Sequence, residues 1–183
     1  MPTARLVNFA LKVMGGDSVA SIEVTSGSAV DTIPGLVTAL KPRVTPDGMV
    51  HGIATSDDGT ATKGYDYNAQ RKQLSVFPLP SDLNGSFHEI ELNDNAKYVA
   101  YVAHVESGKT WAVVRSWPQL AVVARTPPSD GYPSDVGYDQ VGWIDSDHFK
   151  ISYRISSGPS IVVGGDANTR TMTIDTVGTE QSP

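Results

Sequence analysis

The chain has 183 residues, 39% of them hydrophobic and 19% charged, so it is long enough to bury the core of one domain. Its formal net charge of -6 argues against a nucleic-acid partner, because such binding normally needs clustered Lys and Arg. The absence of cysteine excludes disulfides, thiol catalysis and thiolate metal ligands. No segment approaches the ~18 consecutive apolar residues that a membrane span requires.

Two interpretations are open for the N-terminal segment. A short helix within residues 4 to 14 is predicted by apolar residues at helical spacing ahead of Gly15, namely Leu6, Phe9, Ala10 and Val13. A strand from Val7 to Met14 fits nearly as well, and strands are expected at Val19 to Thr25 and Val30 to Ile33. The segment lacks a basic lead-in and a cleavage site, so a cytoplasmic protein is expected, or a periplasmic or secreted one if the chain is already trimmed.

Three polar turns recur along the rest of the chain. They are Thr45-Pro46-Asp47-Gly48, Asn93-Asp94-Asn95 and Asp145-Ser146-Asp147, each followed by a run in which every second residue is apolar. A second turn closes each run at Gly59, Gly108 and Gly158. The period of about 50 residues is typical of the blades of a β-propeller.

The alternation of residues predicts four strands in each of the last two units. The clearest strand covers 148 to 155, where Phe149, Ile151 and Tyr153 alternate with polar residues and are expected to face a core. Residues 97 to 105 are apolar on both faces, as expected of an interior strand. The segment from Lys63 to Tyr67 is polar and predicts a poor inner strand. The other expected strands cover 87–92, 110–115 and 120–125 in one unit and 140–144, 160–163 and 171–176 in the next.

These strands predict an all-β fold, a propeller-like array of four-stranded antiparallel meanders. One domain, 1-183, is expected, with approximate units 1-36, 37-82, 83-126 and 137-178; three units are clear, and the first is a candidate for a fourth sheet. The alternatives are that the ring does not close within one chain, so that an open arc forms a homodimer, or that the chain is one piece of a longer propeller. A β-sandwich or barrel is the alternative fold.

Part of the chain resembles a known family. The stretch LNDNAKYVAYVAHVESGKTWAVVRS is similar to a blade of the TolB-type propellers, and YDQVGWIDSDHFKISYRISSGPSIVV and VTPDGMVHGIATSDDGT look like further copies. Pro46-Asp47-Gly48 keeps the turn of that family, whereas the turns at 94–96 and 146–148 lack its Pro and Gly. The resemblance implies a propeller fold. Such propellers mostly serve as binding platforms, and some support hydrolases.

A phosphate-loop pattern is present but is interpreted as a hairpin turn. Residues Ala103 to Thr110 end in Gly-Lys-Thr, yet the residues after Thr110 predict a strand. The phosphate-binding mechanism needs a helix N-terminus at that place. Lys109 is therefore expected to be a surface residue.

Candidates for catalysis and metal binding are few. The four histidines, His51, His88, His104 and His148, show no ligand spacing. His51 and His104 occupy comparable places in their units, which suggests an inner channel, although strand histidines with satisfied hydrogen bonds are favoured. The acidic turns at 57–58, 94 and 145–147 offer carboxylate oxygens, so calcium is the one candidate cofactor. Because none has the spacing of a calcium loop and Asx residues usually cap their own turns, no cofactor and no catalytic residue is predicted.

The longest irregular segment, Thr126 to Asp139, predicts the binding site. It combines aromatic and acidic residues on a proline-stiffened backbone, and the expected contact residues are Asp130, Tyr132, Asp135, Tyr138 and Asp139. The expected function is that of a non-enzymatic binding or scaffold module with a protein or carbohydrate partner. The alternative is a hydrolase, or an accessory domain of one, that acts on glycans or peptides with carboxylates in a central channel. An inter-blade connector is the simpler interpretation of the segment.

Overall fold

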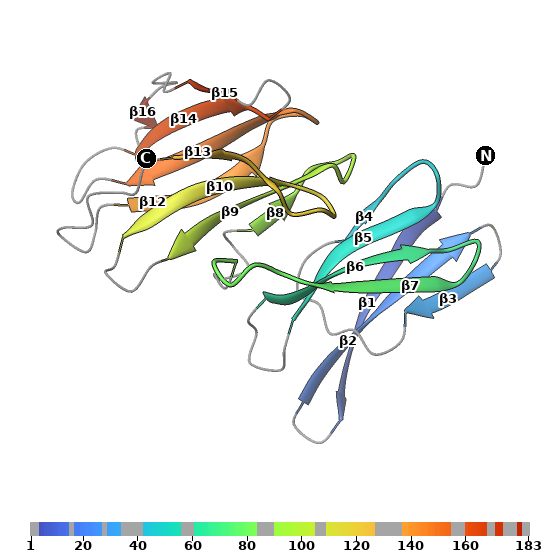
Figure 1. Ribbon diagram of the computed structural model, residues 1–183. Helices are drawn as coiled ribbons and strands as arrows, with labels where there is room; N and C mark the ends of the chain where they lie inside the picture. The colour runs from blue at the N-terminus through green and yellow to red at the C-terminus, as the bar shows by residue number, and fades with distance from the viewer. Residues whose placement is uncertain are drawn as a thin grey trace. The chain divides into compact units, whose positions relative to one another are not determined.

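The protein is built from antiparallel β-sheets, as the alternation of its residues predicts (Figure 1). The computed structural model describes residues 4–14, 17–26, 29–33, 42–55, 61–83, 90–104, 109–126, 137–154, 160–167, 171–173 and 179–180. All secondary-structure elements in these ranges are strands, so the all-β prediction is confirmed. In the same ranges no helix is long and apolar enough to cross a membrane.

The chain divides into two compact units. Unit 1 comprises Met1–Leu79 with Asp94–Ala96, and unit 2 comprises Pro80–Asn93 with Lys97–Pro183. Unit 1 contains a three-stranded and a four-stranded sheet. Unit 2 contains a four-stranded sheet and a five-stranded one.

The first sheet of unit 1 is formed by β1 (Ala4–Met14), β2 (Asp17–Ser26) and β3 (Ala29–Ile33) in chain order. The N-terminal segment is thus a strand, and the helix expected within residues 4 to 14 is wrong. A β-bulge explains the error: Leu6 pairs with Val24 but Phe9 with Ile22, so two residues of β1 lie opposite one of β2. The extra residue places apolar positions three apart, which is also the spacing of a helix.

The second sheet of unit 1 has the order β4 (Arg43–Val44), β5 (Met49–Thr55), β6 (Ala61–Asn68) and β7 (Gln73–Pro78). β6 is an interior strand, which corrects the prediction that its polar sequence makes a poor one. Tyr65 and Tyr67 alternate with polar residues, and both are buried with Val50 and with Ile33 of the first sheet. Their two aromatic rings supply apolar area that the composition of the segment hides.

The first sheet of unit 2 is formed by β8 (Ile90–Leu92), β9 (Tyr98–His104), β10 (Thr110–Ser116) and β11 (Val122–Arg125), in the order β11-β10-β9-β8. The strands follow the predicted segments. Each residue from Val99 to Ala103 is 0% exposed, which confirms that β9 is an interior strand covered on both faces.

The second sheet of unit 2 has the order β12 (Gly137–Trp143), β13 (His148–Arg154), β14 (Ser160–Asp166) and β15 (Thr171–Thr173), and β16 (Thr179–Glu180) also pairs with β14. Phe149 and Ile151 are fully buried on β13, as the alternation predicts, and Lys150 between them is exposed. The side chain of Tyr153, the third predicted core residue, lies outside the described residues.

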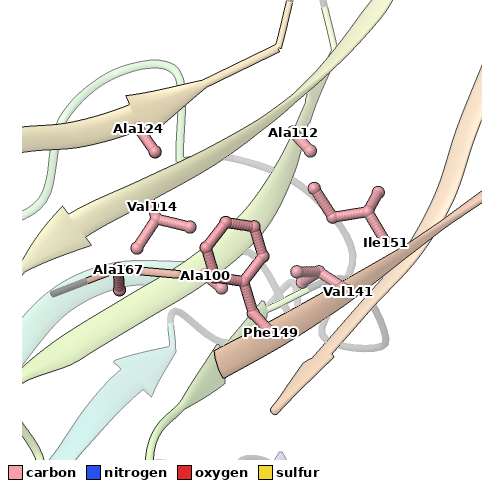
Figure 2. Close-up of a cluster of buried hydrophobic side chains, with 8 residues drawn as sticks. All are labelled: Ala100, Ala112, Val114, Ala124, Val141, Phe149, Ile151 and Ala167. Atoms are coloured by element: carbon pink, nitrogen blue, oxygen red, sulfur yellow. The ribbon is translucent and has the colours of Figure 1, made fainter. Parts of the chain in front are cut away.

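The two sheets of unit 2 pack face to face around one apolar cluster (Figure 2). Four of its residues come from β9, β10 and β11, namely Ala100, Ala112, Val114 and Ala124, and the other four are Val141, Phe149, Ile151 and Ala167. Small residues on the first sheet leave room for the Phe149 ring, so the faces interlock. The last three sheets each contain an antiparallel meander of four consecutive strands, and none of the described sheets closes into a barrel.

The three predicted first turns each connect the first two strands of a sheet. In two of them a side chain holds the turn: Asn93 Oδ1 accepts hydrogen bonds from the backbone N–H groups of Lys97 and Tyr98, and Asp145 Oδ1 accepts from those of Asp147 and His148. These are the Asx caps that the sequence suggests. The predicted closing turns lie largely outside the described residues.

Candidate functional site

A tryptophan and an arginine of unit 2 contact each other where the predicted binding segment, residues 126 to 139, begins. Arg125 is the last residue of β11, and its Cζ lies 5.2 Å from the ring centre of Trp111 on β10. The register pairs Arg125 with Val113, so Trp111 is its diagonal neighbour across the two strands. Arg125 is exposed and Trp111 half-buried, which makes this cation–π pair a surface feature.

Both stems of the predicted segment, residues 126 to 139, attach to the beginning of β10. Thr126 donates its backbone N–H to Ala112 O and accepts that of Ala112 on its Oγ1, each at 3.0 Å. At the other stem, Tyr138 N donates to Thr110 Oγ1 at 2.8 Å. The two threonines are buried, so these hydrogen bonds also satisfy their polar groups. We call Trp111, Arg125 and Tyr138 with the segment between the stems the loop-end surface.

The structure places one of the five predicted contact residues in detail. Tyr138 lies at the start of β12, half-buried, and packs against the apolar cluster of unit 2. Asp139 follows it in β12, with its side chain outside the described residues, and Asp130, Tyr132 and Asp135 lie outside them entirely. Sequence reasoning missed Trp111 and Arg125, because only the strand register brings residues 14 apart in the chain together.

The threonine of the Gly-Lys-Thr sequence is the first residue of a strand. Thr110 is the first residue of β10, and its hydroxyl accepts the N–H of Tyr138. A phosphate loop would need a helix N-terminus after the lysine, with its backbone N–H groups turned to the phosphates. The hairpin interpretation of the string is therefore favoured.

We expect Lys109→Ala to change the melting temperature little and ATP with magnesium to cause no saturable shift in either protein. Lys109 stands just before β10, where a surface substitution stays within about 0.5 kcal/mol. Thermal unfolding at increasing nucleotide concentration measures this. A nucleotide-dependent shift that the substitution abolishes would contradict the hairpin interpretation.

A hydroxyl, an imidazole and a carboxylate are connected on one face of the second sheet of unit 1. His51 Nδ1 lies 2.7 Å from Asp66 Oδ1, its partner across β5 and β6, and His51 Nε2 lies 3.1 Å from Thr45 Oγ1. The side chains of His51 and Asp66 are 13% and 15% exposed. We call Thr45, His51 and Asp66 the relay.

Asp47 contacts the relay from the turn between β4 and β5. Thr45 Oγ1 donates to Asp47 Oδ1 at 2.6 Å, and this hydrogen bond is the main reason that the pKa of Asp47 lies below its ordinary value. Met49 N donates to the same oxygen at 3.3 Å. The turn thereby holds the Thr45 hydroxyl in place beside His51.

The other histidines lie elsewhere in the chain. His104 ends β9 and is exposed, whereas His51 is the third residue of β5, so the expectation that they occupy comparable places is wrong. His148 Nδ1 lies 2.8 Å from Asp145 Oδ2 at the surface. His88 lies outside the described residues.

Of the predicted acidic turns, the one at 145–147 binds its own backbone N–H groups, whereas Asp94 pairs with Arg43 Nη1 at 3.2 Å. The N–H groups of Asp147 and His148 hold the pKa of Asp145 below its ordinary value. Among the described residues no group of three or more His, Asp or Glu could hold a metal ion. Asp57 and Asp58 lie outside that part of the chain.

A half-buried polar cluster joins Asp82 to the first sheet of unit 2. Arg115 Nε donates to Tyr101 Oη at 2.7 Å, and its Nη2 lies 3.0 Å from Asp82 Oδ2. Arg115 Nη1 donates to Leu120 O at 2.8 Å. Each nitrogen of the guanidinium forms a hydrogen bond within unit 2, so we interpret this cluster as structural.

No protein-family model matches the chain, and a search of curated proteins finds no match.

Proposed function

We propose that the protein is a binding module that recognises a protein or carbohydrate partner through the loop-end surface. The observation that carries this proposal is the Arg125–Trp111 pair beside the two anchored stems of the segment 126–139. Trp, Tyr and Arg are the residues that most often dominate binding energy at interfaces. Trp111, Tyr138 and Arg125 lie where the segment 126–139 begins and ends.

The anchoring of this surface favours binding. Hydrogen bonds to Ala112 and Thr110 fix where the segment begins and ends, so fewer conformations are lost when a partner binds. The guanidinium of Arg125 is held over an aromatic ring and keeps its edge for a partner's acceptor groups. The predicted contact residues Asp130, Tyr132, Asp135, Tyr138 and Asp139 belong to this proposal.

The proposal includes a propeller-like arrangement of the sheets. Its support is that each later sheet is a meander of consecutive strands and that two such sheets pack face to face within unit 2. If the ring is completed between two chains, the protein is a homodimer. A solution mass from light scattering distinguishes one chain from two.

We expect Arg125→Ala and Trp111→Phe each to weaken the partner's binding about tenfold or more, as the loss of a dominant contact does. Ligands are first identified with a glycan array and by affinity capture, and each purified ligand is then titrated calorimetrically. Val122→Ala on the same strand is the matched control, because Val122 is 51% exposed and away from the pair. Replacing 128–136 with a Gly-Ser bridge tests the segment itself.

Two results would overturn the proposal. One is unchanged affinity of the identified ligand for Arg125→Ala, Trp111→Phe and the shortened protein. The other is an equal loss in Val122→Ala, which would indicate a general effect on the sheet. Melting temperatures of all variants confirm that folded proteins are compared.

A further inference from the structure

The relay has the connectivity of a nucleophile, a base and a group that orients the base. The hydroxyl-to-imidazole distance of 3.1 Å and the imidazole-to-carboxylate distance of 2.7 Å are both within hydrogen-bond reach. That arrangement identifies an activated hydroxyl in acyl-transfer enzymes whatever their fold. The proposed binding function does not use these residues.

The position of the protons follows from the chemistry of Asp66. An ionised carboxylate can only accept hydrogen bonds, so the His51 nitrogen that faces it, Nδ1, carries the proton. In the neutral imidazole the other nitrogen, Nε2, then has a lone pair. Thr45 Oγ1 lies 3.1 Å from this lone pair, while its hydroxyl donates to Asp47 Oδ1 at 2.6 Å and to Met49 O at 3.2 Å. The hydroxyl proton must therefore turn from these two acceptors to reach Nε2.

The strand register fixes this geometry. His51 and Asp66 are directly opposite on β5 and β6, and β6 lies between two neighbours, so neither backbone is at an edge. Thr45 is fixed by hydrogen bonds at both ends of its turn, from Thr45 N to Met49 O and from Gly48 N to Thr45 O. Pro46 and Asp47 beside it are exposed, so a substrate can approach from the turn.

We propose that Thr45, His51 and Asp66 form a catalytic site that hydrolyses carboxylic esters. In the first step Thr45 Oγ forms a bond to the acyl carbon, its proton passes to His51 Nε2, and the ester C–O bond breaks as the alcohol takes that proton. In the second step the oxygen of a water molecule forms a bond to the acyl carbon while one of its protons passes to His51 Nε2. The bond between the acyl carbon and Thr45 Oγ then breaks, the acid leaves, and Oγ takes the proton back from Nε2.

A carboxylate beside the nucleophile restricts the substrate. Asp47 Oδ1 lies 2.6 Å from Thr45 Oγ1, and the exposed Asp47 stands on the side from which a substrate can approach. An acyl group with a negative charge would be repelled there. The substrate class is therefore an ester of a neutral or cationic acyl group.

Asp47 competes with His51 for the hydroxyl proton of Thr45. Its Oδ1 is closer to Thr45 Oγ1 than His51 Nε2 is, at 2.6 against 3.1 Å. In Asp47→Asn the side-chain oxygen remains but loses its charge and becomes a weaker acceptor. We expect this variant to hydrolyse esters faster than the original protein.

The test is the hydrolysis of p-nitrophenyl acetate by the full chain. We expect kcat/KM to fall about 100-fold or more in Thr45→Ala and in His51→Asn, the usual effect of losing an acid–base group. Thr45→Ser should keep activity, since it keeps a hydroxyl. Mass spectrometry of peptides after brief exposure to the ester should find the acetyl group on Thr45.

Matched controls separate this site from the rest of the protein. Val76→Ala changes an exposed side chain of β7 on the opposite face from Asp66, and Lys150→Ala changes an exposed side chain of unit 2; neither should alter hydrolysis. The proposal is overturned if Thr45→Ala hydrolyses the ester as fast as the original, or if no acetyl group is found on Thr45. Because the binding test uses other residues, either proposal can fail while the other stands.

Discussion

Replacing Ile151 by alanine is expected to lower the free energy of unfolding by about 2–5 kcal/mol. Ile151 is 0% exposed on β13 and belongs to the cluster that joins the two sheets of unit 2. The substitution removes buried methyl groups and leaves a cavity, because the facing sheet is held by its own hydrogen bonds. Denaturant unfolding followed by the fluorescence of the three tryptophans measures the loss.

Lys150→Ala is the matched control for this substitution. Lys150 is adjacent in the same strand but exposed, so the change should stay within about 0.5 kcal/mol. Similar losses in the two variants would mean that the side chains of β13 do not alternate between core and solvent, and that the register of the sheet is wrong.

Replacing Gly52 by alanine is expected to lower the free energy of unfolding of unit 1 by about 1–3 kcal/mol. Gly52 pairs with Tyr65, whose ring crosses the glycine so closely that an added Cβ would lie 2.5 Å from its Cζ and 2.7 Å from its Cε1. The ring is fully buried, so it cannot turn away without disturbing the core. Thermal unfolding checks this.

Tyr65→Phe provides a control at the other side of this contact. The Tyr65 hydroxyl is buried and has no hydrogen-bond partner in the described part of the chain, and burial raises its pKa above the ordinary value. Removing a hydroxyl of this kind should be close to neutral for stability. It also removes the atom closest to the added Cβ, so Gly52→Ala should be less harmful in the Tyr65→Phe background. An unchanged melting temperature of Gly52→Ala would contradict the close approach.

The sequence by itself determined the class of the fold and most of its strands. The alternation at Phe149 and Ile151 and the apolar run of β9 are local patterns that a strand imposes on its own residues. The three first turns are likewise local, because Asn93 and Asp145 hold their turns through side chains only a few residues from the groups that they bind. Such features need no knowledge of distant partners.

Only the tertiary structure decided the features that depend on which strand lies opposite. The bulge in β1 explains why a segment whose apolar residues have helical spacing forms a strand. Burial of Tyr65 and Tyr67 explains why a segment of polar composition forms an interior strand. The Arg125–Trp111 pair and the relay join residues 14 and 15 positions apart, or across a turn, through the register of neighbouring strands. The side chains of a strand alternate between two faces with a period of two residues, and this pattern does not specify which strand will lie beside it. These contacts therefore form only when the sheets assemble.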